Sequence, residues 1–188
     1  MVITPLAGLL LGFLDFLWIR YVPFPFGGLG NSPAVWAVAA FLLTWRARWG
    51  LGASAAAGAV LLVVAVPAYY LAAWLIQHDD LANVYAAYAL QWMAMGVLAG
   101  AVFGSGGHLA RTPGRLRRAA LALPGAVLFA EAAIEVRRIG APDYGVAGPL
   151  GLAILLVLLG ALLSRRSLLL TVPLAALGFA LFTITGFH

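Results

Sequence analysis

The stretch ALALPGAVLFAEAAIEVRR, residues 120–138, decides the fold class of this chain. It opens on a long uncharged run and then carries Glu131 and Glu135 four residues apart, followed by Arg137 and Arg138. A helix needs about 20 mostly apolar residues to cross a hydrocarbon layer roughly 30 Å thick. The stretch therefore predicts a membrane-spanning helix that carries its polar groups toward one end.

The rest of the chain has the same apolar character. Of its 188 residues, 64% are hydrophobic and 9% are charged, and the mean hydropathy is +1.04, outside the usual balance of a soluble domain. The apolar runs are continuous and lack the alternation of membrane-barrel strands. We expect an all-α fold: a polytopic transmembrane helical bundle, formed as a single integral membrane domain by residues 1–188.

Connections rich in arginine, glycine or proline divide the chain into about seven candidate spans. The second of these is short, so six spans plus a re-entrant segment are the alternative. The N-terminal stretch has no basic leader and no small-residue cleavage site, which favours a retained first span over a signal peptide. The expected spans are roughly residues 3–22, 33–46, 53–77, 82–104, 118–137, 146–163 and 168–187.

The net charge of +5 reports membrane topology and not a nucleic-acid partner, because the eleven basic residues, all arginine, lie in short connections between apolar runs. Seven spans with a cytoplasmic N-terminus place eight arginines inside and three outside, which satisfies the positive-inside rule. Six spans with an external N-terminus give nine against two. Both arrangements put the loop 105–118 inside and the C-terminus outside the cell membrane.

In the seven-span arrangement the acidic residues all fall toward the outer side. Glu131 lies about seven residues, roughly 10 Å, below the outer end of its helix, and Glu135 and Arg138 follow on the same helical face. Ionisable groups inside a span are functional by default, so we predict a polar binding stripe; a surface ion pair of Glu135 with the neighbouring arginines is the alternative. The six acidic residues are Asp15, Asp79, Asp80, Glu131, Glu135 and Asp143.

Aromatic side chains are expected at the same level as the stripe. Together with carboxylates and arginines they can hold a flat polar or cationic solute by charge-assisted hydrogen bonds and cation–π contacts, although an interface belt with ordinary helix packing explains them too. Asp15 is expected to join the site or to pair with Arg20 or another arginine. The aromatic and amide residues concerned are Tyr70, Trp74 and Gln77 in the third span and Tyr85, Tyr88, Gln91 and Trp92 in the fourth.

Prolines and glycines give two further expectations. Pro67, Pro124 and Pro173 fall inside spans, where each frees a carbonyl group, and broken helices often mark solute sites in transporters. Small residues spaced four apart allow close helix packing; packing within the bundle is the main interpretation and a partner-binding face is the alternative. These residues are Gly8 and Gly12 in the first span and Gly96, Gly100 and Gly104 in the fourth.

Several kinds of chemistry are excluded or disfavoured. The chain has no cysteine and no lysine, which removes disulfides, thiolate chemistry and a lysine Schiff base. His78, His108 and His188 are scattered, so no metal site and no cofactor is predicted. The segment GSGGH, residues 104–108, is interpreted as a glycine-rich helix end, because Ser105 has no evident base within reach.

Four segments resemble an uncharacterised family of small bacterial multi-pass membrane proteins over roughly residues 5–165; this resemblance implies a membrane bundle and carries no known activity. They are NSPAVWAVAAFLL, PAYYLA, GAVFGSGGHLAR and LFAEAAIEVRR. In size and helix count the chain is also similar, more distantly, to the S components of energy-coupling factor vitamin transporters. That resemblance implies an outward-opening site and a first helix that docks on a partner through Ala7, Gly8 and Gly12.

We therefore predict an integral membrane protein that binds a small solute from the outer face, as a transporter or its substrate-binding subunit. Its expected partners are the lipid bilayer and a small-molecule solute, with a membrane partner subunit as the open alternative and no nucleic acid. Glu131 and Glu135 would supply negative charge or a proton-linked switch, and Arg137 and Arg138 would orient an anionic group. The alternatives are a structural or assembly subunit without a site, and an intramembrane hydrolase that uses Ser105 or Glu131.

Overall fold

The computed structural model describes residues 3–141, 145–165 and 167–184, and these contain helices and connections without any strand. Expectations that concern Asp143, Arg166 and His188 lie outside the described residues. Two short 3-10 segments, η1 (Phe26–Leu29) and η2 (Leu81–Tyr85), precede the second and fourth helices. The α-helices are α1 (Ile3–Tyr21), α2 (Pro33–Ala47), α3 (Leu51–Gln77), α4 (Ala87–Arg111), α5 (Arg117–Arg138), α6 (Ala147–Ser164) and α7 (Leu168–Ile184).

The expectation of an all-helical, membrane-compatible chain is confirmed. Five helices, α1, α3, α4, α5 and α6, are long and apolar enough to cross a membrane. The other two, α2 and α7, are apolar but shorter. The structure thus supports five spans by length and composition, and the count of about seven stays a prediction.

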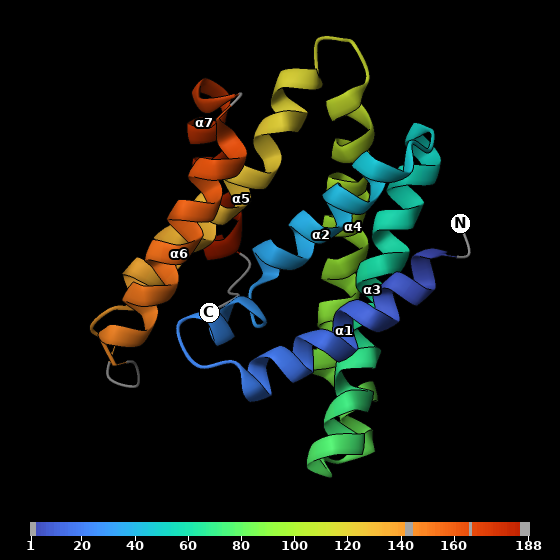
Figure 1. The fold of residues 1–188 in the computed structure, drawn as a ribbon, viewed down its shortest axis with the longest axis vertical. Coiled ribbons are helices and arrows are strands. Elements are labelled where there is room, and N and C mark those ends of the chain that lie inside the picture. The colour runs from blue at the N-terminus through green and yellow to red at the C-terminus, as the bar shows by residue number, and fades with distance from the viewer. Residues whose placement is uncertain (1–2, 142–144, 166, 185–188) are drawn as a thin grey trace.

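The helices form two packed groups (Figure 1). In the first group α3 lies between α1 and α4, and α2 packs on both α3 and α4. In the second group α5 lies between α6 and α7. The groups meet where α5 contacts α2 and α4. Helix α5 thus joins the second group to the first, and α6 adds a contact with η1.

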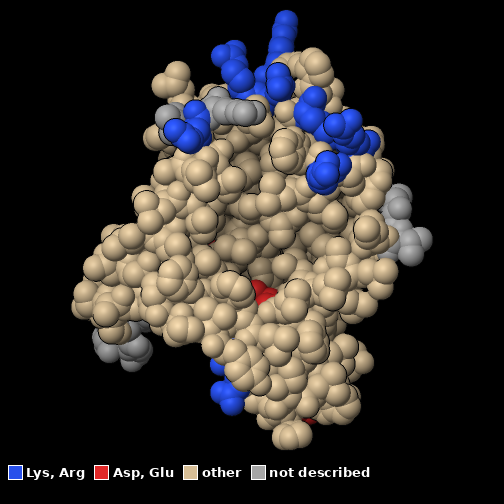
Figure 2. Space-filling view, viewed as in Figure 1, with Lys and Arg blue, Asp and Glu red and all other residues tan. Residues whose placement is uncertain are grey.

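The two signs of charge are segregated along the long axis of the molecule. The connections α2–α3, α4–α5 and α6–α7 lie toward the upper end in Figure 1, and Figure 2 shows arginine side chains gathered at that end. Below them the visible face carries a recessed patch of acidic atoms near its middle and a smaller group of basic atoms toward its lower end. The described arginines of these connections are Arg46, Arg48, Arg111, Arg115, Arg117, Arg118 and Arg165.

Glycines bring α1 and α4 close to opposite sides of α3. A Cβ atom added to Gly12 would overlap the carbonyl group of Ala65, and one added to Gly100 would overlap the carbonyl group of Gly58. Such contacts between backbones contribute van der Waals packing that larger residues would prevent. All the glycines that the sequence singled out face α3 in this way, namely Gly8, Gly12, Gly96, Gly100 and Gly104.

The segment GSGGH leads into the last turn of α4. Helix α4 continues through this segment to Arg111. A Cβ atom on Gly107 would overlap the Thr44 hydroxyl and lie 2.5 Å from the Phe41 carbonyl oxygen. These glycines are therefore needed for the close approach of α4 to α2, and not for breaking the helix.

The three internal prolines lie inside helices, as expected. Pro67 is in α3, Pro124 in α5 and Pro173 in α7. Proline leaves one carbonyl group of the preceding turn without its helical donor. Helices α3, α5 and α7 thus each contain one irregular turn.

Candidate functional site

The described residues enclose a cavity of about 620 Å³ between the two helix groups, which we call the central cavity. Its walls come from α1, α2, α3, α4, α5 and α7 together with the end of the α1–α2 connection. Most of the lining is aliphatic or aromatic, and the charged lining residues are Asp15 and Asp79. The aromatic lining residues are Trp36, Tyr69, Tyr70, Tyr88, Trp92, Phe103 and Phe182.

Asp15 is a buried acidic residue of α1 at the edge of this cavity, with 9% of its surface exposed. The indole of Trp36 in α2 is its side-chain hydrogen-bond partner. The expected pairing with Arg20 is not formed, since the ion pair recorded among residues 3–141, 145–165 and 167–184 joins two residues of α5. Burial of a carboxylate without a cation is costly, so Asp15 is the most unusual polar group of the central cavity.

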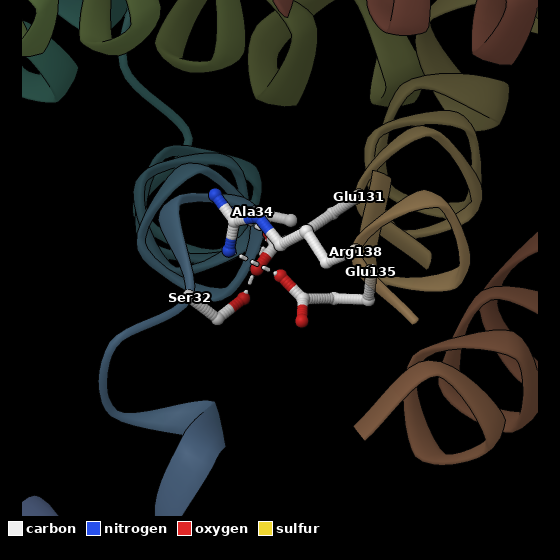
Figure 3. A network of polar contacts seen from close by, with 5 residues as sticks. All are labelled: Ser32, Ala34, Glu131, Glu135 and Arg138. Carbon is white, nitrogen blue, oxygen red and sulfur yellow. Dashed lines mark hydrogen bonds and ion pairs between the residues drawn. The ribbon is translucent and has the colours of Figure 1, made fainter. Parts of the chain in front are cut away.

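Glu131 lies in the middle of α5 with 6% of its surface exposed and closes the N-terminus of α2 (Figure 3). Its Oε2 atom accepts hydrogen bonds from the Ser32 hydroxyl at 2.9 Å and from the Ala34 backbone N–H at 2.8 Å. The first N–H groups of a helix have no partner within the helix, and the helix dipole favours a negative charge there. Glu131 therefore holds α2 against α5 and satisfies groups that would otherwise be buried without partners.

The start of α2 is also encoded locally. Ser32 occupies the N-cap position, its hydroxyl accepts from the Val35 N–H at 3.2 Å, and Pro33 follows at the first helical position. Both choices are typical of a helix start. The sequence NSP thus predicts where α2 begins, and the fold supplies the distant glutamate.

Glu135 and Arg138 form an ion pair on the next turn of α5, with 2.7 Å between Glu135 Oε1 and Arg138 Nη1. Their side chains are 7% and 28% exposed. Together with Glu131 they line a second cavity of about 400 Å³, which we call the side cavity. The polar stripe expected on one face of this helix is thus gathered at one cavity.

The central and side cavities adjoin. Tyr88 and Trp92 of α4 line both, with their rings edge to face and their centroids 5.9 Å apart. This aromatic pair therefore lies between the central cavity, which is mostly apolar with acidic groups, and the side cavity, which carries an ion pair. The residues shared by both linings are Asn31, Pro33, Tyr88, Trp92 and Phe182.

Five of the residues expected at the site lie elsewhere. Arg137 places its guanidinium over the Phe179 ring of α7, 5.4 Å from the centroid. The other four are exposed and belong to the lining of neither cavity, namely Trp74, Gln77, Tyr85 and Gln91. The remaining expected residues divide between the chambers: Asp15 and Tyr70 line the central cavity, Glu131, Glu135 and Arg138 the side cavity, and Tyr88 and Trp92 both.

Sequence reasoning missed four prominent lining residues: Trp36, Tyr69, Asp79 and Phe182. Trp36 lies in the short second predicted span, and Tyr69 stands beside the expected Tyr70 in PAYYLA. A signal existed for Asp79, which directly follows the third predicted span. For Phe182 no local pattern distinguishes a cavity-lining side chain from a lipid-facing one.

The end of the segment GSGGH has a structural role. The Nδ1 atom of His108 donates to the Trp49 carbonyl oxygen at 2.8 Å, and the side chains of Arg111 and Ser54 donate to the same oxygen. His108 thus secures the α2–α3 connection against α4. Within the described part of the chain, no group of three or more His, Asp or Glu residues is placed to hold a metal ion.

A sequence model of one protein family matches residues 1–187, and that family is described as "Family of unknown function (DUF6518)". No curated protein matches the chain, and no solved structure does. The expected resemblance to an uncharacterised family is confirmed, whereas similarity to transporter S components is not shown.

Proposed function

The chain belongs to this family, whose description assigns no activity, and we propose that it is an integral membrane protein that binds a small solute in its central cavity, as a transporter or as the substrate-binding subunit of one. The cavity volume of about 620 Å³ falls within the range of small-molecule sites, roughly 300–1,000 Å³. Such sites are mostly apolar and carry a few convergent polar groups. The central cavity has this composition.

The observation that carries the proposal is the placement of Asp15. A carboxyl group with 9% exposure lines the central cavity and has an indole N–H, not a cation, as its side-chain partner. Polar groups inside membrane proteins are expensive and commonly belong to solute or proton pathways. A packing role alone would be served better by an apolar side chain.

We place the arginine-rich end at the cytoplasmic side, because positive charge accumulates in cytoplasmic connections. Asp15, Asp79 and Glu131 then lie toward the outer side, with the N-terminus inside and the C-terminus outside the cell membrane. The central cavity is entered from the outer face in this arrangement. Solute uptake is the transport direction that it favours.

Glu131 has a positioning role in this proposal. It fixes the start of α2, and the adjacent residues Asn31 and Pro33 line both cavities. Glu135 and Arg138 form the polar wall of the side cavity, through which a solute passes before it reaches Asp15.

The proposal can be tested by placing a larger side chain in the central cavity. Ala99 of α4 lines the central cavity, whereas Ala94 on the same helix is exposed and lines neither cavity. Native mass spectrometry of gently extracted protein is expected to show a bound small molecule with the wild type and with Ala94→Phe, and its loss with Ala99→Phe. Equal occupancy in all three proteins, or a wild type that carries only lipid, contradicts the proposal.

The assembly-subunit alternative is tested by the same spectra. The glycines spaced four apart in α1 and α4 pack against α3 inside the molecule, so they offer no surface to a partner. A stoichiometric protein partner that is present without any bound solute would favour that alternative.

A further inference from the structure

We propose that the central cavity takes an organic cation, namely an amine attached to a flat apolar body, with Asp15 as its counter-ion. This inference rests on the proposed function and names the chemical class of its solute. It concerns charge balance, aromatic lining and the apolar remainder of the cavity, which are independent observations.

The charge balance of the lining is negative. Asp15 and Asp79 are the acidic lining residues, and the described lining contains no arginine or histidine. The chain has no lysine, and Arg138 lies in the side cavity, where it pairs with Glu135. A cationic solute therefore supplies the charge that the protein itself does not place beside Asp15.

Aromatic rings surround the acidic groups. Trp36 hydrogen-bonds to Asp15, and Tyr69 feels the charges of both Asp15 and Asp79. Tyr69 is itself held edge to face between Phe16, at 5.6 Å, and Tyr70, at 5.4 Å between centroids. Rings fixed around a carboxylate are suited to an ammonium group, because cation–π attraction strengthens when the cation is desolvated.

The rest of the lining matches an apolar body. The lining includes several aliphatic side chains, namely Leu62 and Val66 of α3, Leu123 and Val127 of α5 and Leu174 of α7. A hydrated metal ion would instead need about six oxygen ligands, and among the described residues no cluster of three or more metal-ligating side chains is present. The site is thus built for a cation whose charge is carried by a mainly apolar molecule.

The test compares two probes with the same ring system, 1-naphthylmethylamine, a cation at neutral pH, and 1-naphthylmethanol, which is uncharged. Equilibrium dialysis against protein in lipid nanodiscs, corrected with empty nanodiscs, measures binding to the wild type and to three variants. Asp15→Asn and Asp79→Asn remove cavity charges, and Asp80→Asn is the matched control, since Asp80 is exposed and lines neither cavity.

The amine is expected to bind the wild type and Asp80→Asn saturably. Its affinity for Asp15→Asn is expected to be lower by a factor of about ten or more, and its affinity for Asp79→Asn lower by several-fold. The alcohol is expected to bind weakly and equally to all four proteins, which also reports that Asp15→Asn is folded. If Asp15→Asn does not fold, the Asp79→Asn variant, at a half-buried position, shows whether amine binding depends on the charge of the cavity.

The outcomes separate the two proposals. Equal binding of amine and alcohol, or amine binding that is unchanged in both cavity variants, overturns the cation class while the cavity remains a solute site. If neither probe binds saturably and the wild type carries no co-purifying solute, both proposals fail.

Discussion

The carboxylate of Glu131 lies 2.9 Å from the hydroxyl of Ser32, although the two residues are 99 positions apart in the chain. The same carboxylate oxygen accepts the Ala34 N–H. A buried side chain of α5 thus serves as part of the cap of α2. The packing of the two helix groups depends on this junction, because α5 is the helix of the second group that contacts α2 and α4.

Replacing Glu131 with Ala is expected to destabilise the protein by about 1–3 kcal/mol, because the Ser32 hydroxyl and the Ala34 N–H lose their acceptor while remaining buried. Glu131→Gln keeps one acceptor oxygen and should cost less. Thermal unfolding in detergent measures both. A double-mutant cycle with Ser32→Ala provides the control: additive effects would show that the two side chains do not interact.

Substituting Gly100 with Ala is expected to lower the free energy of unfolding by about 1–3 kcal/mol, because its new methyl group would overlap the Gly58 carbonyl and force α4 away from α3. Gly52→Ala is the matched control, since no atom lies within 4 Å of its added Cβ. Similar melting temperatures for the two variants would contradict the close approach of these helices.

Arg137 and Arg138 are adjacent in the chain but differ in their contacts, so their substitutions should have different effects. Arg138→Gln leaves the nearly buried Glu135 without its cation in the side cavity and is expected to destabilise by about 2 kcal/mol. Arg137→Gln loses a contact with Phe179 that is worth about 0.5–1 kcal/mol. Chemical unfolding of both variants under identical conditions measures the difference, and the reverse order would refute the assignment.

Membrane orientation can be measured directly, because the natural chain has no cysteine. Single cysteines introduced for Pro113, in the arginine-rich α4–α5 connection, and for Tyr85, in η2, occupy exposed positions at opposite ends. A membrane-impermeant maleimide is expected to label Tyr85→Cys in intact cells and Pro113→Cys only after permeabilisation. Labelling of Pro113→Cys in intact cells would invert the proposed topology.

Hydropathy and breaks in the sequence predict most helix positions well. The expected spans 53–77 and 118–137 correspond to Leu51–Gln77 and Arg117–Arg138. The fourth helix departs from its expected range 82–104, because Asp80 caps a separate 3-10 turn before it and because glycines near its end pack against α2 without interrupting it. Hydropathy shows which segments are apolar, but it does not show which glycines pack against a neighbouring helix.

The candidate site was most directly predictable where its residues share one helix. Spacing along α5 places Glu131, Glu135 and Arg138 on one face, and they do line one cavity. The contact of Glu131 with Ser32 and the placement of Trp36 beside Asp15 join distant segments. Such contacts arise from the way the helix groups dock, which no local pattern records.

The division of the cavity wall between two helix groups has a mechanical consequence. Each group is held together by its own close-packed interior, whereas the groups meet where α5 contacts α2 and α4 and where α6 contacts η1. Both groups line the central cavity. A tilt of one group against the other would therefore change the width of this cavity while the interior of each group stays packed. The junction at which Glu131 caps α2 is one of the contacts between the groups, so it limits how far they can tilt.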